Sequence, residues 1–366
     1  MIDYKKLAGE ELLRLAPYKP GKPMTEVQRE SGVENVIKLA SNENPIGPSP
    51  KAIKALEDFL PEVSRYPLGD SYYLRKAISE KYGIDMDQIL CGAGSDEIIQ
   101  LLYIAFLQKG THAISPAPSF SEYYILAKSL GADCKWVATN EDFSVNFDNI
   151  LNAIDENTRF VFLANPNNPT GLAFGEKELT DFLDKLPSNI IVAMDEAYIE
   201  FAERADMPDS IKLMKKYKNL LVMRTFSKAY GLASVRCGFL VADKECIDVV
   251  QRVRPPFNVS MPAQVMAAAA LGDDEHIKKV VSENAAGRDY IYAELTKMGI
   301  EYVPTEANFM LVKTGNGQKV FEDMLLKGVI VRFLGGEELK DYIRVSVGTM
   351  EENKIFIEKL AEVLGK

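Results

Sequence analysis

Continuous runs of apolar residues alternate along the chain with segments of helical periodicity. The apolar runs, which are typical of strands covered on both faces, are 88–92, 111–116, 134–139, 158–164, 189–195, 219–225 and 236–242. The helical patterns between them include 94–110, 119–131 and 176–186. This alternation predicts an α/β fold with a doubly wound, mostly parallel sheet. Ligands of such sheets bind beyond the carboxyl ends of the strands.

The two ends of the chain have different patterns. After the last apolar run of the sheet, the C-terminal part predicts helices and three short strands, which indicate a smaller α+β unit. The N-terminal part is helical and then rich in proline, as expected for an arm. We therefore predict an arm or small-domain segment over 1–40, a large ligand-binding domain over 41–262 and a small domain over 263–366.

Charge and composition narrow the classes of function. The formal net charge of −10 argues against a surface for nucleic acid or anionic membranes. No apolar run is long enough to cross a bilayer, and the first residues lack the apolar core of a signal peptide, so we expect a cytoplasmic protein. The four cysteines form no CxxC pair, and the two histidines lie in unrelated contexts. A metal site or a histidine-driven triad is therefore not expected.

The stretch RTFSKAYGLASVRCGF, residues 224–239, places Lys228 among small and apolar residues. The stretch contains two arginines but no acidic residue that could pair with the lysine. Burial disfavours the charged form of a lysine and favours a neutral, nucleophilic amine. Lys228 is therefore predicted to take part in covalent chemistry.

Two other apolar runs end in polar side chains. In NIIVAMDEAY, Asp195 ends a strand, where a carboxylate is costly unless it meets a cation or a metal. A helix cap or a salt bridge would explain it equally well. In FVFLANPNNPTG, a loop with two prolines and a glycine presents Asn165, Asn167 and Asn168, although an ordinary tight turn has the same composition. Both ends are predicted to lie near the Lys228 loop.

A candidate phosphate site follows another strand. The segment QILCGAGSDEII reads as a strand, a glycine-rich turn and a helix, and Gly94 and Ser95 open that helix. Free N–H groups and the positive end of the helix dipole suit an anion there, although Ser95 as a plain N-cap fits the pattern too. Glu97 occupies the third glycine position of a dinucleotide fingerprint, which disfavours a nucleotide-dependent dehydrogenase. Ser227 and Arg236 could add a hydroxyl and a guanidinium to the same anion.

Together these parts suit the cofactor pyridoxal 5′-phosphate. Lys228 would bond to the cofactor's aldehyde, and Asp195 would keep its pyridine nitrogen protonated so that the ring accepts electrons. Asn168 would donate to the phenolic oxygen of the ring, with Tyr198 nearby. Phe120 would stack on the ring, although its position also fits an ordinary core residue.

The motifs NPNNPTG, MDEAY and TFSKAYGLASVRCGF, in this order, resemble the class I/II aminotransferases of fold type I. RTFSKAYGLASVRCGF in particular resembles the histidinol-phosphate aminotransferase branch. Further segments in that branch's order, such as KLASNENPIGPSP and IRVSVGTMEENKIFIEKL, extend the resemblance over nearly the whole chain. It implies a pyridoxal-phosphate-dependent fold in which residues 41–262 bind the cofactor, and a homodimer whose active sites are shared between subunits.

The resemblance also implies roles for individual residues. Around the cofactor phosphate it places the backbone of Ala93 and Gly94 together with Ser95, Ser227 and Arg236, and it places Tyr66 there from the neighbouring subunit. It puts Asn168 and Tyr198 at the phenolic oxygen and Phe120 at the ring face. The substrate's anionic group would be held by Arg344, Arg332 and Tyr18, in a pocket lined by Asn44 and Asn308. By itself, Arg332 would also fit a surface arginine.

The reaction that the resemblance implies is amino-group transfer between L-histidinol phosphate and 2-oxoglutarate in histidine biosynthesis. Lys228 would act as its general base. The alternatives on the same scaffold are an aromatic or broad-specificity aminotransferase and a threonine-phosphate decarboxylase. A binding protein with a degenerate cofactor pocket is disfavoured, because every candidate catalytic position holds a competent residue.

Overall fold

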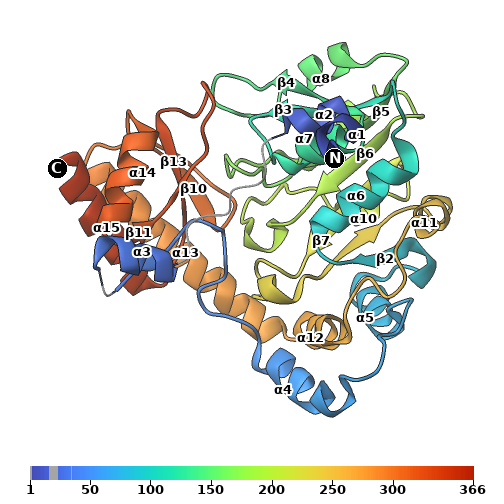
Figure 1. The fold of residues 1–366 in the computed structure, drawn as a ribbon, viewed down its shortest axis with the longest axis horizontal. Coiled ribbons are helices and arrows are strands. Elements are labelled where there is room, and N and C mark those ends of the chain that lie inside the picture. Colours follow the sequence, from blue (N-terminus) through green and yellow to red (C-terminus); the bar gives the residue numbers. More distant parts are fainter. Residues whose placement is uncertain (1, 16–23, 34) are drawn as a thin grey trace.

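The computed structural model describes residues 2–15, 24–33 and 35–366. In this part of the chain, a large lobe is built on a seven-stranded sheet with the strand order β2-β8-β7-β6-β5-β3-β4, and a smaller lobe lies beside it (Figure 1). The strands of the large sheet are β2 (Ile89–Gly92), β3 (His112–Ala117), β4 (Asp133–Ala138), β5 (Thr158–Ala164), β6 (Ile191–Asp195), β7 (Leu220–Thr225) and β8 (Gly238–Val241). All seven predicted strands are confirmed.

The helices of the large lobe cover both faces of this sheet. They are α4 (Pro50–Phe59), α5 (Tyr72–Tyr82), α6 (Ser95–Phe106), α7 (Glu122–Ser129), α8 (Phe147–Ala153), α9 (Glu176–Leu183), α10 (Ser210–Leu213), α11 (Lys244–Gln251) and α12 (Met261–Leu271). Alternate residues of β5 show the double burial. Val161 and Leu163 pack into the core beneath α5, α9 and α12, whereas Phe160 and Phe162 pack into the core beneath α6 and α7. Burial on both faces explains why this strand is a continuous apolar run. The predicted doubly wound α/β fold class is confirmed.

The sheet is parallel except at β8, which runs antiparallel to both β2 and β7. The connection from β7 to β8 spans residues 226–237 and holds only the short 3₁₀ turn Ala233–Val235. A parallel neighbour needs a long crossover, usually with a helix, so this connection returns the chain antiparallel instead. Lys228 lies in this connection, at the end of the sheet where β7 finishes.

The smaller lobe holds a four-stranded antiparallel sheet with the order β12-β13-β10-β9. Its strands are β9 (Tyr302–Val303), β10 (Phe309–Lys313), β12 (Arg332–Phe333) and β13 (Tyr342–Ser346), and its helices are α13 (Asp274–Lys297), α14 (Gly317–Leu326) and α15 (Met350–Leu364). The prediction of three strands is wrong in detail. The apolar run after residue 301 forms two strands, because Pro304 has no N–H for the ladder and β9 ends before it.

The N-terminal part contacts both lobes: its segment before residue 15 lies against α7 of the large lobe, whereas its segment after residue 24 packs against α14 of the smaller lobe (Figure 1). It contains α1 (Tyr4–Leu7), α2 (Glu10–Arg14), α3 (Met24–Ser31) and β1 (Ile37–Lys38). Strand β1 pairs in parallel with β11 (Val329–Ile330), which precedes β12. Leu39, just after β1, is buried in the same core as α15.

Helix α13 joins the two lobes (Figure 1). Its C-terminal half contributes Ile291 and Leu295 to the core of the smaller lobe. The preceding helix α12 buries Ala263 and Met266 in the core of the large sheet, although the predicted division at 262/263 would assign α12 to the small domain. The division of the chain into domains stays a prediction, and we would place the second boundary between α12 and α13.

The described residues contain no helix that combines the length and the apolar character needed to cross a bilayer. The four cysteines are free thiols, and Cys91, Cys134 and Cys237 are buried. Burial raises the pKa of the Cys91 thiol to about 12, so it behaves as a small apolar core residue. In the same described ranges, no three His, Cys, Asp or Glu side chains come together as a metal site.

Candidate active site

A cleft of about 1000 Å³ opens at the carboxyl ends of β3, β5, β6 and β7. The strand ends contribute Ala117, Ala164, Asp195 and Thr225 to its walls, and Arg344 of β13 contributes from the smaller lobe. This is the position expected for the ligand of a doubly wound sheet. The predicted site residues that line the cleft are Ser95, Phe120, Asn168, Asp195, Tyr198, Ser227, Lys228, Arg236, Arg332 and Arg344.

Asp195 is a buried carboxylate at the bottom of the cleft, with 5% of its surface exposed. Its Oδ2 accepts a hydrogen bond from the Tyr123 hydroxyl at 2.7 Å, and its Oδ1 accepts one from the Ala197 N–H at 3.1 Å. Burial raises the pKa of Asp195 to about 6, although these two hydrogen bonds act in the opposite direction. Its side chain is neither a helix cap nor part of a salt bridge among the described residues, so the two alternative interpretations are not supported.

Lys228 lies half-buried in the wall of the cleft. Its Nζ donates to the carbonyl oxygen of Ser41 at 3.2 Å and lies 5.6 Å from the centroid of the Tyr198 ring. The amine is therefore only partly enclosed, and its nearest described contacts are a carbonyl oxygen and an aromatic ring. The small and apolar neighbours in the sequence, Phe226, Ala229 and Tyr230, are buried beneath the loop and leave the amine at the surface of the cleft.

Only one of the three asparagines in the NPNNPTG loop faces the cleft. The side chain of Asn165 hydrogen bonds to the backbone of Phe174, and that of Asn167 donates to the Pro118 carbonyl oxygen at 3.0 Å. Asn168 lines the cleft, where its Oδ1 accepts a hydrogen bond from Nη1 of Arg344 at 2.6 Å. The first two side chains therefore fix the loop, and Asn168 is the one available to a ligand.

Tyr198 is held in place by two contacts. Its hydroxyl accepts a hydrogen bond from Nδ2 of Asn42 at 3.1 Å, and its ring packs edge-on against Phe309 at 4.9 Å. The guanidinium of Arg344 lies 5.3 Å from the centroid of the same Phe309 ring and donates to the Ala40 carbonyl oxygen at 2.8 Å. The segment around residues 40–42 thus contacts both Tyr198 of the large lobe and Arg344 of the smaller lobe.

The predicted phosphate site forms a cradle at the start of α6. Gly94 is the N-cap, with φ of +89°, and Ser95 is the first helical residue, so the interpretation of Ser95 as N-cap is wrong. The positive φ at position 94 strains any residue with a Cβ, which explains why a glycine is favoured there, and a Cβ would also lie 2.5 Å from Nη2 of Arg236. Nη1 of Arg236 donates to the Ser227 hydroxyl at 3.3 Å, and Nη2 forms an ion pair with Asp96 at 3.2 Å.

Two backbone groups predicted for this cradle are already bonded within the chain. The Ala93 N–H donates to Oε2 of Glu97 at 2.6 Å, and the Gly94 N–H donates to the Gly92 carbonyl oxygen at 2.8 Å. Glu97 is thereby turned away from the cradle, toward Asn258. The N–H groups of the first turn of α6, which have no acceptor inside the helix, are better placed for an anion than those of Ala93 and Gly94.

Arg332 and Arg344 form a pair of cations from the smaller lobe. They are directly opposite each other on the antiparallel strands β12 and β13, so their side chains share one face of the sheet. Within the described residues, Arg332 forms no ion pair or side-chain hydrogen bond, and both arginines line the cleft. This pair is suited to binding a phosphate or carboxylate.

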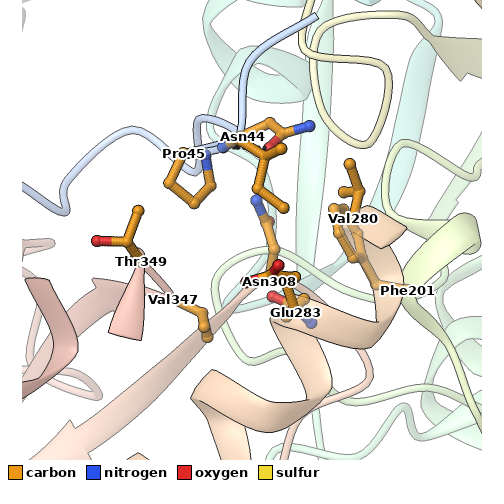
Figure 2. A pocket seen from close by; sticks show the side chains of 11 residues that line it. Asn44, Pro45, Phe201, Val280, Glu283, Asn308, Val347 and Thr349 are labelled. Atoms are coloured by element: carbon orange, nitrogen blue, oxygen red, sulfur yellow. Dashed lines mark hydrogen bonds between the residues drawn. The ribbon is translucent and has the colours of Figure 1, made fainter. Parts of the chain in front are cut away.

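Asn44 and Asn308 do not line this cleft. They lie at a separate cavity of about 20 Å³, too small for a substrate, between the N-terminal segment, α13 and the smaller sheet (Figure 2). Asn44 donates to the Ala229 carbonyl oxygen at 2.8 Å, and Asn308 donates to that of Asn42 at 3.1 Å. They therefore anchor the Lys228 loop and the 42–47 segment, and the prediction that they line the substrate pocket is not supported.

Two further predicted residues lie elsewhere. Tyr66 is 83% exposed and stacks on Phe257, with ring centroids 4.8 Å apart. It lies outside the cleft, as expected for a residue that would act on a neighbouring subunit. Tyr18 lies outside the described residues.

Sequence reasoning missed several residues of the cleft. Tyr123, the partner of Asp195, lies in an amphipathic pattern that predicts only a helix. Asn42 carries no motif signal of its own, but SNENP lies in a polar, turn-rich stretch that could have drawn attention to it. Other lining residues that were missed include Ser41, Ser119, Glu122 and Trp136 and the loop residues 334–339, which follow Arg332.

These residues fit pyridoxal phosphate. The glycine-opened cradle with Arg236 and Ser227 suits its phosphate, and the buried Asp195 suits a pyridinium nitrogen, which would offset the cost of burying the carboxylate. Lys228 provides an amine on the wall of the same cleft. Asn168 and Tyr198 supply further polar groups in this cleft.

Comparisons with known proteins show the family to which the chain is related. The chain matches the model of the family described as aminotransferase class I and II over residues 34–360. A histidinol-phosphate aminotransferase of Akkermansia muciniphila is 42% identical over 365 residues, which cover 99% of this chain and 100% of that protein. One from Shouchella clausii is 44% identical over 361 residues, or 98% and 97% of the two chains. The crystal structure of histidinol-phosphate aminotransferase from Sinorhizobium meliloti in complex with pyridoxal-5′-phosphate has a TM-score of 0.90 at 24% identity, covering 98% of this chain and 97% of that one, so the two share a fold.

Proposed function

Because the chain belongs to the class I and II aminotransferase family, we propose that it transfers the amino group between L-histidinol phosphate and 2-oxoglutarate. The products are imidazole-acetol phosphate and L-glutamate. Family membership confirms the predicted fold type and enzyme class, and with them pyridoxal phosphate as the cofactor. The proposed substrate rests on the full-length relatives named for this reaction and on the paired arginines of the cleft.

The residues around the cofactor and those around the substrate's anionic group have distinct tasks. When bound, pyridoxal phosphate supplies a ring that withdraws the negative charge developing at the substrate's α-carbon. Asp195 would keep the ring nitrogen protonated, and Asn168 and Tyr198 would orient the ring through its phenolic oxygen. Lys228 would hold the cofactor through its amine, and the same Nζ, when free, would serve as the general base for the proton on the substrate's α-carbon. Ser95, Ser227 and Arg236 bind the cofactor phosphate.

Arg332 and Arg344 bind the substrate's anionic group. Histidinol phosphate lacks a carboxylate, and its phosphate would occupy the anion site that otherwise holds a carboxylate of glutamate. A pair of guanidinium groups can hold either anion in turn. The Arg344–Asn168 hydrogen bond links this anion site to the cofactor side of the cleft. The observation that carries the proposal is this pair of cations, one of them without an ion pair in the described part of the chain, in the same cleft as Lys228.

Arg332→Ala should raise the KM for histidinol phosphate by roughly 10- to 100-fold, the effect of losing a hydrogen bond to a charged group. The KM for phenylalanine should rise less, because phenylalanine has no phosphate. Steady-state kinetics with both substrates measure the difference. Arg252→Ala, which removes an exposed arginine paired with Asp248, is the control and should change neither KM. Equal effects of Arg332→Ala on both substrates would contradict a phosphate site at Arg332.

A direct assay tests the proposed reaction. Purified protein loaded with pyridoxal phosphate should convert histidinol phosphate only when 2-oxoglutarate is present, and faster than it converts phenylalanine or decarboxylates threonine phosphate. A higher kcat/KM for phenylalanine would favour the aromatic aminotransferase instead. Release of carbon dioxide from threonine phosphate would favour the decarboxylase.

We also propose that the enzyme is a cytoplasmic homodimer with shared active sites. Tyr66, exposed and stacked on Phe257, lies in a segment that also exposes Leu60, Val63 and Tyr73. Exposed apolar side chains in one segment are typical of a protein interface. In the dimer, Tyr66 would reach the cofactor phosphate of the neighbouring subunit.

Mixed dimers test this arrangement. Tyr66→Ala and Lys228→Ala remove parts of the same site from different subunits, so a mixed dimer keeps one intact site. Co-expression should restore about a quarter of wild-type activity, since half of the dimers are mixed and each has one native site. If mixed dimers form, as shown by native mass spectrometry, and activity stays at the level of the single variants, the sites are not shared.

A further inference from the structure

Tyr123 is buried beside the cofactor site, and its sequence pattern predicts no function for it. It lies in α7, with 0% of its surface exposed. Its ring stacks on Phe162 at 4.8 Å and meets Phe120 edge-on at 5.6 Å. These contacts aim its hydroxyl at Asp195, to whose Oδ2 it donates a hydrogen bond of 2.7 Å.

The surroundings of Asp195 disfavour its charge. Asp96 from α6 and the adjacent Glu196 add negative charge near it, and burial removes it from water. In the described part of the chain its carboxylate has no ion-pair partner, and the bonded donors are the Tyr123 hydroxyl and the Ala197 N–H. Tyr198 lies on the same loop and bonds to Asn42 instead. Tyr123 is therefore the one side chain among the described residues that donates a hydrogen bond to this carboxylate.

We propose that Tyr123 is a positioning residue, whose hydroxyl fixes the Asp195 carboxylate at the bottom of the cleft and keeps it ionised for the cofactor's pyridinium nitrogen. A phenol donates to a carboxylate more strongly than to the neutral acid, so the bond favours the ionised form. A carboxylate oxygen accepts more than one hydrogen bond, so Tyr123 leaves room for the pyridinium N–H. The residue acts through Asp195 and does not touch the reacting atoms.

Tyr123→Phe tests the proposal, because it removes the hydroxyl and keeps the ring. The dissociation constant of pyridoxal phosphate from the protein, measured at pH 7 by fluorescence titration, should rise roughly 10- to 100-fold, as for a lost hydrogen bond to a charged group. In a pH series, the pH below which cofactor affinity declines should move upward relative to the wild type. A purely structural role of Tyr123 would not shift that profile.

Tyr103→Phe is the matched control. Tyr103 is also fully buried and donates a hydrogen bond of 2.7 Å, but to the backbone carbonyl oxygen of Tyr123. Tyr103→Phe therefore removes a hydroxyl group from the same core, but this hydroxyl does not contact Asp195. Its cofactor affinity should change less than about threefold, with an unshifted pH profile, even if its stability falls by the ~1 kcal/mol of one hydrogen bond. If Tyr123→Phe and Tyr103→Phe bind pyridoxal phosphate with the same dissociation constant, Tyr123 is not a positioning residue for Asp195.

A double-mutant cycle separates support for the carboxylate from general packing. In an Asp195→Asn background there is no charge to hold, so Tyr123→Phe should cause no further loss of cofactor affinity. An equal loss in both backgrounds would overturn the proposal. If Tyr123→Phe does not fold, 3-fluorotyrosine at position 123 keeps the shape and makes the hydroxyl a stronger donor. Tighter cofactor binding is then expected, and unchanged or weaker binding would overturn the proposal.

Discussion

Replacing Lys228 with alanine should lower kcat for amino transfer by at least about 10⁴-fold, because the covalent attachment and the general base are lost together. The change should cost the cofactor-free protein less than about 1 kcal/mol of unfolding free energy, since the amine makes one hydrogen bond, to the Ser41 carbonyl oxygen. Stopped-time assays for glutamate formation and denaturant unfolding measure the two effects separately.

A surface lysine provides the control for this variant. Lys177→Ala removes an exposed side chain that pairs with Asp181 on α9, and neither rate nor stability should change by much. Turnover by Lys228→Ala at a rate near that of the Lys177→Ala control would contradict the role of Lys228.

Asp195→Asn should have opposite effects on activity and on stability. Losing the charge that supports the pyridinium should lower kcat/KM by roughly 10²- to 10³-fold, as for other preorganised electrostatic groups. At pH 8 the cofactor-free variant should nevertheless be more stable than the wild type by about 1–3 kcal/mol, because an ionised carboxylate is no longer buried without a cation. A buried charge that lowers the unfolding free energy of the cofactor-free protein is expected where the charge is needed for function.

The pH dependence of this difference follows from the pKa of Asp195. Because its folded-state pKa of about 6 lies above the ordinary value of 3.8, the folded protein binds the proton more tightly than the unfolded chain. The contribution of Asp195 to stability is therefore present below pH 3.8 and is lost as the pH rises through about 6. Urea unfolding of both proteins from pH 4 to pH 8 should show the advantage of Asp195→Asn growing over this window. An advantage independent of pH would show that Asp195 is not the titrating group.

The sequence predicted the large sheet well because its strands are buried on both faces. Phe160 to Leu163 of β5 pack alternately into two cores, so every position is apolar and the strand is visible as a continuous run. The direction of β8 could not be predicted, because its apolar run looks the same in either orientation. Strands β1 and β11 are two residues each and pair across most of the chain, so no local pattern indicates them.

The candidate site was predictable where function disturbs a local pattern. Asp195 and Lys228 are polar groups that interrupt apolar surroundings, and both line the cleft. Tyr123 could not be recognised, because a buried tyrosine is ordinary in an amphipathic helix and only the fold brings it to Asp195. Asn44 and Asn308 were assigned to the substrate pocket by their motifs, but their side chains are used to hold neighbouring backbone.

Mapping the covalent attachment of the cofactor tests the central claim most directly. Protein loaded with pyridoxal phosphate is reduced with borohydride, digested and analysed by mass spectrometry. The modified residue should be Lys228, at close to one label per chain, and the label should be absent from Lys228→Ala. A label on another lysine, or no label on the loaded wild-type protein, would contradict the assignment of this cleft as the catalytic site.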